Sequence, residues 1–169
     1  MFNKTVFMTL FFFIMLCACG QDKTPIATLE PALLTANDVG HFCGMLVTEH
    51  DGPKGQVFLK NTAQPLWFVS ARDSLAFSRM PDEQFKVSVI YVSDMGKAES
   101  WEQPGDHAWV KAQDAYFVEG SKRPGGMGMA EWVPFSEKIK AEQFISEYGG
   151  KIVRIDAIET DALLGEDKT

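Results

Sequence analysis

The sequence has little of what a disulfide-stabilised or zinc-binding protein requires. It contains three cysteines and three histidines in 169 residues, and Cys17 and Cys19 lie at the end of an N-terminal apolar run. If Cys17 is removed with residues 1–18 and Cys19 is acylated, Cys43 is the one free thiol that remains, which excludes an intramolecular disulfide. Around Cys43 there is no second cysteine and no histidine pair at the spacing of structural zinc sites. The chain must therefore fold through its core alone, with one free thiol.

The sequence also lacks an excess of positive charge and a membrane-spanning run. It has 16 Lys and Arg against 23 Asp and Glu, a formal charge of -7. Such a surface does not suit nucleic acid or anionic lipid as a partner. The apolar run over residues 5–16 is too short to cross a bilayer comfortably. Lys4 precedes the run, and a positive charge followed by a short apolar run is typical of a secretory signal.

The end of that run is more specific than a general secretory signal. Leu16-Cys17-Ala18-Cys19 resembles the lipobox of bacterial lipoproteins, in which the last cysteine is acylated and becomes the new N-terminus. We therefore predict a signal peptide over residues 1–18, with lipidation at Cys19. Gly20 stands where an aspartate would signal retention in the inner membrane, so the expected location is the periplasm, on the outer membrane. Residues 19–36 are predicted to be the lipidated N-terminus and a flexible tether.

The first folded unit is predicted over residues 37–93. With 46% hydrophobic and 23% charged residues, the composition is that of an ordinary globular domain. The stretches "GMLVTEH" and "GQVFLKN" flank the turn signal "DGPKG" and predict a hairpin, which "PLWFV" extends. Ser70 is an N-cap for a helix over "ARDSLAFSRM", with Asp73 in its first turn. The alternating stretch "FKVSVIYV" predicts a strand.

A second unit with the same element order is predicted over residues 107–160, after a connector and possible hinge at residues 94–106. The stretches "HAWVKAQDAYFVEG", "EWVPF" and "KIVRIDAIE" predict strands. Between the last two, a helix begins at Ser136 and ends at Gly149. Residues 161–169 are predicted to be a polar tail. The predicted fold is α+β, with two similar β-β-α-β units packed together, mostly antiparallel sheets and one helix in each unit.

Sulfur side chains carry the chemistry of the sequence. In "HFCGM", His41, Cys43 and Met45 alternate, so an extended backbone would place them on one side. A thiolate and a thioether together suit Cu(I). Methionine is usually a core filler. That interpretation is weak for Met127 in "PGGMGMA", because glycines on both sides leave its thioether no local apolar face.

Other functions for Cys43 remain open at this point. From "CGM" alone, a buried structural cysteine is as well supported as a metal ligand. A catalytic pair of Cys43 with a histidine would make the protein a thiol-dependent enzyme, although no recognised cysteine-hydrolase signature surrounds it. A lipid-anchored interaction module without a metal is the third possibility.

Three stretches together carry a family resemblance: "HFCGMLV", "DAYFVEGSKRPGGMGMAEWVPF" and "FSEKIKAEQFISEYGGKIVRIDAI". From about residue 37 to 160 the chain resembles the NosL family of accessory lipoproteins for nitrous-oxide reductase. The resemblance implies a Cu(I) chaperone rather than an enzyme, held to the membrane by its lipid anchor. It implies delivery of copper to the apo reductase, with a membrane ABC-transporter assembly complex as a partner and no role for nucleic acid.

The resemblance also implies a ligand set. The family's CxM pair falls on Cys43 and Met45, and its later methionine falls on Met127. This sequence reads "GMGMAE" where relatives tend to have a proline, so whether Met129 replaces or assists Met127 stays open. From the residues themselves, His41 stays open as a further nitrogen ligand, a ligand of a second, harder metal, or a hydrogen-bonded structural histidine.

Overall fold

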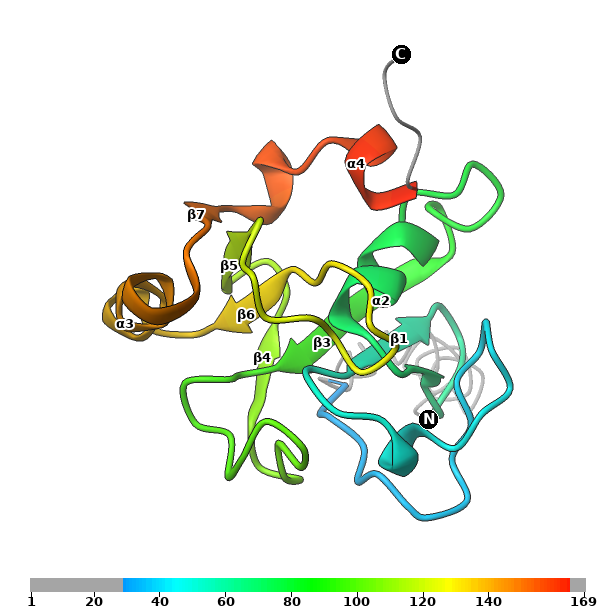
Figure 1. Ribbon diagram of the computed structural model, residues 1–169. Coiled ribbons are helices and arrows are strands. Elements are labelled where there is room, and N and C mark those ends of the chain that lie inside the picture. The colour runs from blue at the N-terminus through cyan, green and yellow to red at the C-terminus, as the bar shows by residue number, and fades with distance from the viewer. Residues whose placement is uncertain (1–28, 165–169) are drawn as a thin grey trace, which may run out of the picture.

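Two small antiparallel sheets form the body of the protein, described over residues 29–164 of a computed structural model (Figure 1). In spatial order, the first sheet contains β2 (Leu66–Phe68), β1 (Gly55–Leu59), β3 (Val87–Ser93) and β4 (Trp109–Lys111). The second sheet contains β6 (Val133–Phe135), β5 (Tyr116–Glu119) and β7 (Lys151–Val153). The other elements are η1 (Val47–Glu49), α2 (Ala71–Phe77), α3 (Lys138–Tyr148), η2 (Ile155–Ala157) and α4 (Thr160–Leu164).

The two sheets repeat one topology. In the first, β1 lies between β2 and β3, and α2 connects those two flanking strands. In the second, β5 lies between β6 and β7, and α3 makes the equivalent connection. All of these pairs are antiparallel. The predicted α+β fold of two β-β-α-β units is therefore confirmed.

The single strand predicted over residues 107–120 is wrong, because it is two strands in different sheets. β4 pairs with β3 and extends the first sheet, whereas β5 is the centre of the second. Between them the backbone turns, with Asp114 N–H donating to Lys111 O at 2.9 Å. The turn carries the chain from one sheet to the other.

The hairpin predicted around "DGPKG" is also wrong. Its first half contains the helical turn η1, with Val47 fully buried and the N–H of Val47 bonded to Asp38 O. The hairpin partner of β1 is β2, which pairs Gly55 with Phe68 and Val57 with Leu66. "PLWFV" therefore returns alongside β1 instead of extending it.

Local capping determines where the two main helices begin and end. Ser70 caps α2 as predicted, because its Oγ accepts a hydrogen bond from Asp73 N–H at 3.3 Å. The predicted cap at Ser136 is wrong, since Glu137 occupies the cap position and makes no side-chain bond there. Ser136 instead donates its N–H to Asp94 Oδ1 at 3.0 Å. Gly149 ends α3 as predicted, with φ at 71°.

Part of the predicted tether is docked on the first sheet. Ala32 exchanges two hydrogen bonds with the buried Gln56 side chain, at 2.8 and 2.9 Å. Tyr91 Oη donates to Leu29 O at 2.6 Å. The ordered chain therefore begins before Asn37. The signal peptide and Cys19 lie outside the described residues, and no helix between residues 29 and 164 is long and apolar enough to cross a membrane.

The connector and the start of the tail also pack on the body of the protein. Trp101 in the connector stacks on Phe144 of α3, with ring centroids 6.1 Å apart, and the guanidinium of Arg123 lies over the Trp101 ring. The tail, predicted to be polar, begins with α4, where Leu163 is only 3% exposed. The backbone carbonyl of Leu163 accepts a hydrogen bond from Arg72 at 3.2 Å. Both segments therefore contribute to the fold.

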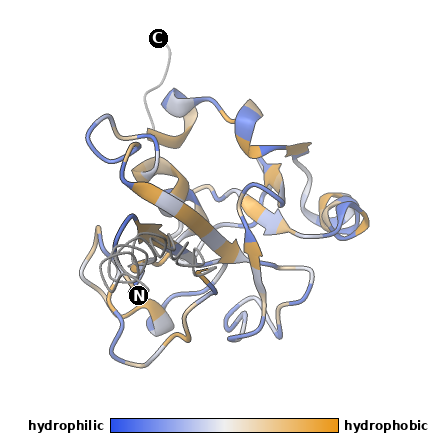
Figure 2. Ribbon diagram, turned by 180° about the vertical axis from the view of Figure 1, so that it is seen from behind, coloured by the Kyte–Doolittle hydropathy of each residue, from blue (hydrophilic) through white to orange (hydrophobic). Residues whose placement is uncertain are grey.

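A shared hydrophobic core joins the two units. Leu75 of α2, Val92 of β3 and Phe117 of β5 belong to one cluster, and each is at most 1% exposed. Figure 2 shows how apolar residues gather on the strands. Burial of each such side chain contributes about 1.5–3 kcal/mol. The units are therefore halves of one folded body, and the sequence between them does not act as a free hinge.

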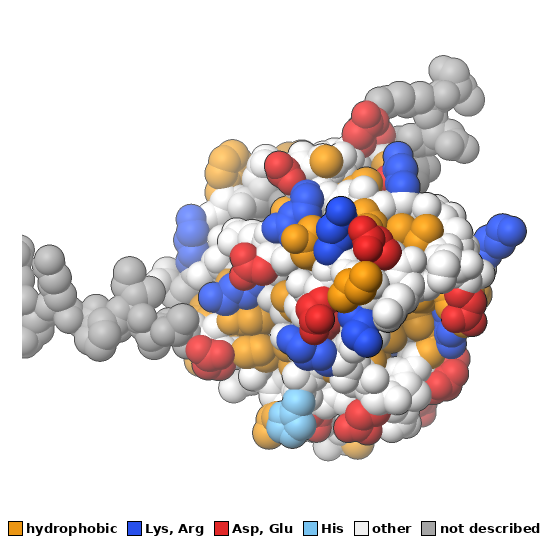
Figure 3. Space-filling view, turned by 90° about the vertical axis from the view of Figure 1, so that its left-hand side faces the viewer, with side chains coloured by type: hydrophobic (Ala, Val, Ile, Leu, Met, Phe, Trp, Pro, Cys, Tyr) orange, Lys and Arg blue, Asp and Glu red, His pale blue; other side chains and the backbone are white. Residues whose placement is uncertain are grey.

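The surface over α3 carries charges of both signs. Figure 3 shows basic and acidic side chains interspersed on this face. Lys138 pairs with Glu142 at 3.3 Å, and Lys151 pairs with Glu119 of the adjacent strand at the same distance. Exposed pairs of this kind contribute little to stability.

Candidate metal centre

Residues 40–45, which carry three of the predicted ligands, form a tight turn. Gly40 N–H donates to Met45 O at 2.8 Å, and Gly44 N–H donates to Gly40 O at 2.7 Å. Gly44 has a φ of 67°, which side-chain-bearing residues rarely adopt. The predicted extended segment, with His41, Cys43 and Met45 on one side, is therefore wrong. The left-handed glycine reverses the chain where a strand would have continued.

Cys43 is half-buried beside the first sheet. Its side chain packs against the apolar cluster of Val47, Trp67 and Val69. A Cβ added at Gly40 would lie 2.8 Å from the Cys43 Sγ, so the absence of a side chain at residue 40 makes room for the thiol. Met45, at the end of the same turn, is 38% exposed. The turn thus holds its thiol against the body and its thioether toward solvent.

His41 lies on a different side of the turn from Cys43. Its N–H donates to Trp67 O at 2.7 Å, and its ring centroid lies 5.7 Å from that of Phe68 and 5.3 Å from that of Phe77. Trp67 and Phe68 are neighbours on β2, so their side chains point to opposite faces. The ring of His41 therefore contacts one face of β2 and the sulfur of Cys43 contacts the other.

The second predicted ligand segment is the glycine-rich loop of residues 123–131. Gly125 N–H donates to Met129 O at 2.9 Å, and Gly128 N–H donates to Gly125 O at 2.8 Å. Gly128 has a φ of 74°. Met127 is 45% exposed and Met129 is 60% exposed. The backbone of the loop is thus fixed by its own hydrogen bonds while both thioethers remain accessible.

This loop packs against the first unit close to the end of η1. A Cβ at Gly126 would overlap the backbone of Asp51, so only glycine permits this approach. The neighbouring Gly52 donates its N–H to Trp101 O at 2.7 Å, which joins the connector to the same place. The chain therefore brings the predicted ligand segments of both units to one side of the molecule.

A cavity of about 300 Å³ lies between the two ligand segments. Its walls include Phe42 from the turn, Met127 and Met129 from the loop, and Ala76 from α2. Cys43 is the next residue after Phe42, but neither Cys43 nor Met45 is among the described residues that line the cavity. The structure thus places Met127 beside the turn, with the thiol of Cys43 facing the neighbouring apolar cluster.

Met80 and Glu131 also line this cavity, and neither was predicted as a site residue. Met80 lies just beyond α2, at helical spacing from Asp73 and Ala76, which share the cavity wall. That spacing is the one sequence signal that could have pointed to Met80. For Glu131, no signal in "AEWVPF" distinguishes a buried carboxylate from an exposed one.

Burial shifts the protonation of two groups near the loop. Glu131 is 3% exposed, and burial raises its pKa to about 7, although its Oε1 accepts hydrogen bonds from the N–H groups of Arg72 at 2.8 Å and Trp132 at 2.9 Å. Burial lowers the pKa of Lys54 to about 8, against the opposing effect of Glu131 and Asp51. Both shifts arise from the loss of water around a charged group.

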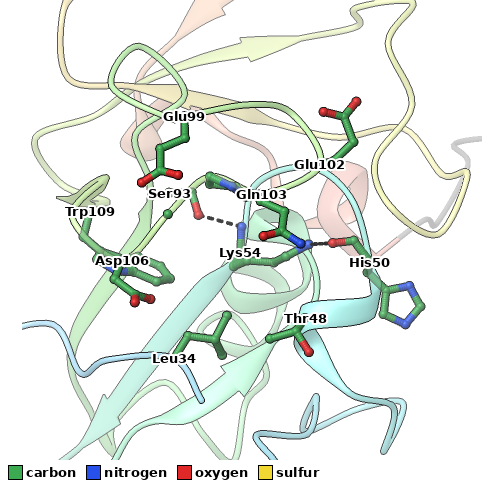
Figure 4. Close-up of a pocket in the computed structure, with 12 residues that line it drawn as sticks. Leu34, Thr48, His50, Lys54, Ser93, Glu99, Glu102, Gln103, Asp106 and Trp109 are labelled. Carbon is green, nitrogen blue, oxygen red and sulfur yellow. Dashed lines mark hydrogen bonds between the residues drawn. The ribbon is translucent and has the colours of Figure 1, made fainter. Parts of the chain in front are cut away.

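A second cavity of about 300 Å³ has Lys54 in its wall (Figure 4). Lys54 Nζ donates to the backbone carbonyls of His50 and Asp51. Glu99, Glu102 and Asp106 stand around the rim. None of the described residues that line this cavity carries sulfur. Nor are three or more His, Cys, Asp or Glu side chains grouped to hold a metal ion anywhere in residues 29–164.

Fold and site together define a two-unit α+β protein that presents thioethers on glycine-containing loops beside a half-buried thiol. The chain belongs to the NosL family, whose family model matches residues 31–163. The family assignment made from the sequence is thereby confirmed.

Relatives and a solved structure agree with this assignment. The chain is 42% identical to a copper-binding lipoprotein NosL from Achromobacter cycloclastes and 34% identical to one from Stutzerimonas stutzeri. Each match covers 89% of this chain and 77% of the relative. The crystal structure of the copper chaperone NosL from Shewanella denitrificans has 38% sequence identity to the chain and a TM-score of 0.73. That match covers 77% of this chain and 96% of the other.

Proposed function

We propose that this protein is a copper chaperone, which binds Cu(I) through Cys43, Met45 and Met127 and delivers it for assembly of the copper sites of nitrous-oxide reductase. The names of its relatives, copper-binding lipoprotein and copper chaperone, support this function. The observation that carries the proposal is the exposure of two thioethers on segments with hydrogen-bonded backbones: Met45, on the turn that also holds Cys43, and Met127, on the glycine-rich loop.

The proposed ligand set matches the chemistry of copper delivery. A thiolate and thioethers are soft ligands, which favour Cu(I) over Zn²⁺ or Ca²⁺. The thiolate of Cys43 neutralises the charge of the ion, and the thioethers add coordination without charge. Thioethers also exchange readily, so a partner can replace them one at a time. Binding of Cu(I) releases the proton of the thiol.

Cys43 reaches the copper by a local movement of the turn. In the structure its side chain packs on the cluster that contains Val47 and Val69, while the preceding Phe42 lines the cavity with Met127. Repacking of residues 42–44 carries the sulfur toward Met127, and Gly44 supplies the backbone freedom. His41 stays packed on Phe68 and Phe77, so we place it outside the copper ligands.

The proposed location is the periplasmic side of the outer membrane. The signal peptide over residues 1–18 would be removed and Cys19 lipidated. From Cys19 to Leu29, where the described structure begins, the chain spans at most about 35 Å when fully extended. This length limits how far Leu29, and the sheet to which it is bonded, can lie from the membrane surface. The partners we propose are the apo reductase and its membrane ABC-transporter assembly complex.

A competition titration tests the ligand set. The purified protein is titrated with Cu(I) against a chelator of known affinity, and the titration is repeated for Cys43→Ser, Met45→Leu, Met127→Leu and His41→Phe. Met95→Leu is the matched control, because Met95 is a partly buried member of the core of the second unit. We expect loss of tight binding in Cys43→Ser, weakening in the two ligand methionine variants, and no change in the other two.

Two results would contradict the proposed function. Micromolar or weaker binding by the unmodified protein would exclude a chaperone role and leave a metal-free interaction module, and equal binding by Cys43→Ser would place the copper at another site. A genetic measurement addresses the delivery step. A strain without the gene should accumulate nitrous oxide, and added copper should relieve the accumulation.

A further inference from the structure

Three methionines from different parts of the chain line one cavity. Met127 and Met129 belong to the loop of residues 123–131, and Met80 lies just beyond α2. We propose that Met80, Met127 and Met129 form an auxiliary, thioether-only Cu(I) site, through which copper passes between a partner and Cys43. This inference rests on the proposed copper function, and it adds two ligands, Met80 and Met129, to the three assigned above.

The exposure of these side chains distinguishes them from core methionines. Met80, Met127 and Met129 are 38%, 45% and 60% exposed, although each has an apolar wall beside it. A methionine that fills space in a core buries its thioether. Met95 shows the usual behaviour, since it packs in the core of the second unit. The three cavity methionines keep their sulfur atoms available to a ligand.

The backbones that carry the three thioethers are held in place. Met80 N–H donates to Phe77 O at 3.2 Å, and Met80 O accepts the N–H groups of Glu83 and Gln84, each at 3.0 Å. Met129 O accepts the N–H of Gly125 at 2.9 Å. Only the flexible side chains therefore need to move when an ion enters, which keeps the entropy lost on binding small.

The cavity has acidic side chains in its wall, which suit a monovalent cation whose charge is not neutralised by its ligands. Thioethers are neutral, so an ion held by them remains Cu(I) with one positive charge. The carboxylates of Asp73 and Glu131 line the same cavity. Among the described residues that line the cavity, Arg72 is the basic side chain; its charge acts on Asp73, its Nε donates to Leu163 O at 3.2 Å, and its guanidinium lies 5.5 Å from the centre of the Trp132 ring.

A site without a thiolate binds Cu(I) more weakly than the site that contains Cys43. The auxiliary site therefore acts on the rate at which copper passes between Cys43 and a partner. Copper enters on the exposed Met129 and moves to Met127, which it shares with the Cys43 site. It then bonds to the Cys43 sulfur as that thiol loses its proton to water. Each step exchanges one Cu–S bond for another, and the ion stays Cu(I) throughout. The reverse order releases copper to a partner.

Methyl NMR tests the auxiliary site directly. The protein carries ¹³C-methyl methionine, with each signal assigned by a Met→Leu substitution, and the Cys43→Ser variant is titrated with Ag(I) as a soft probe that does not change oxidation state. We expect the methyl signals of Met80, Met127 and Met129 to shift together, with that of Met95 unchanged. Static signals for Met80 and Met129, or an equal shift of Met95, would overturn the proposal.

Transfer kinetics test its role in the protein with Cys43 intact. The Met80→Leu/Met129→Leu double variant conserves side-chain volume, so its folding stability should be close to that of the unmodified protein. Its rate of Cu(I) transfer to excess chelator should fall about tenfold, which corresponds to about 1.4 kcal/mol of barrier. An unchanged rate would overturn the relay and leave the chaperone function intact. Absence of Cys43-dependent binding in the unmodified protein would overturn both.

Discussion

At the scale of single residues, the loop of residues 123–131 depends on a buried acid. Glu131 accepts the N–H groups of Arg72 and Trp132 and lies beneath Gly125, where a Cβ would come within 3.0 Å of its Oε2. The carboxylate thus connects α2 to the loop that carries Met127. The arrangement keeps a charged group out of water, and its energetic cost depends on pH.

Stability should therefore fall as pH rises through the titration of Glu131. Its pKa is about 4.5 when the chain is unfolded and about 7 when folded, so the folded state binds more protons between those values. The free energy of unfolding should decrease by about 2 to 3 kcal/mol from pH 4.5 to 8, on account of this group. In Glu131→Gln this part of the slope should vanish, as measured by urea denaturation at pH 5, 6, 7 and 8. Parallel pH profiles for the two proteins would contradict the assignment.

At the scale of elements, close approach of the glycine-rich loop to the first unit should be essential for the site. A Cβ in Gly126→Ala overlaps the backbone of Asp51, whereas one in Gly128→Ala meets no atom within 4 Å. Gly128→Ala should still destabilise by about 1 kcal/mol, because its φ is 74°. We expect Gly126→Ala to cost more, about 2–3 kcal/mol, and to weaken Cu(I) binding.

Thermal denaturation and Cu(I) titration of both variants check this comparison. Gly128→Ala is the matched control, since it changes the same loop by the same single methyl group. If both variants lost the same stability and the same Cu(I) affinity, the conformation of the loop would depend on its backbone dihedral angles alone, and not on contact with Asp51.

The sequence predicted those elements whose causes are local. Ser70 and Gly149 bound helices through bonds and dihedral angles within a few residues, so both ends were predictable. Ser136 carries the same local signal, yet a distant carboxylate, Asp94, takes its N–H. The turn at Gly44 was missed because "GMLVT" is as apolar as a strand, and only the contact with β2 decides its path.

The candidate site also combines features that the local sequence predicts with features that only packing between distant segments determines. Sulfur beside glycine made Cys43 and Met127 candidates from the sequence, whereas the cavity itself arises where α2, the turn and the loop meet. No spacing along the chain connects Met80 to Met129. The orientation of His41 and Cys43 against opposite faces of β2 is likewise a property of the packed structure.

At the scale of the whole molecule, the shared core should make the two units unfold together. Phe117 of the second sheet packs in one cluster with Leu75 and Val92 of the first unit and is fully buried. Phe117→Ala should destabilise the protein by about 3–5 kcal/mol. Trp67 and Trp101 occupy different clusters, so they report on the two halves separately.

Denaturation followed through single-tryptophan versions that retain Trp67 or Trp101 measures this coupling. The two transitions should coincide in the parent and shift together in Phe117→Ala. Two separated transitions in the parent would show that each unit folds independently, contrary to the continuous core.

The hydrogen bonds that fasten Leu29 and Ala32 to the sheet have a mechanical consequence for a protein held by its N-terminus. In the proposed lipid-anchored form, a pull on Cys19 would reach the described fold first at Leu29, through the Tyr91 hydroxyl on β3, and then at Ala32, through the Gln56 side chain on β1. These are adjacent antiparallel strands, paired from Gly55–Val92 to Leu59–Val87 with a register shift between Phe58 and Leu59. Tension would thus be shared between two strands of the first sheet before it reached the proposed copper-binding segments at residues 40–45 and 123–131.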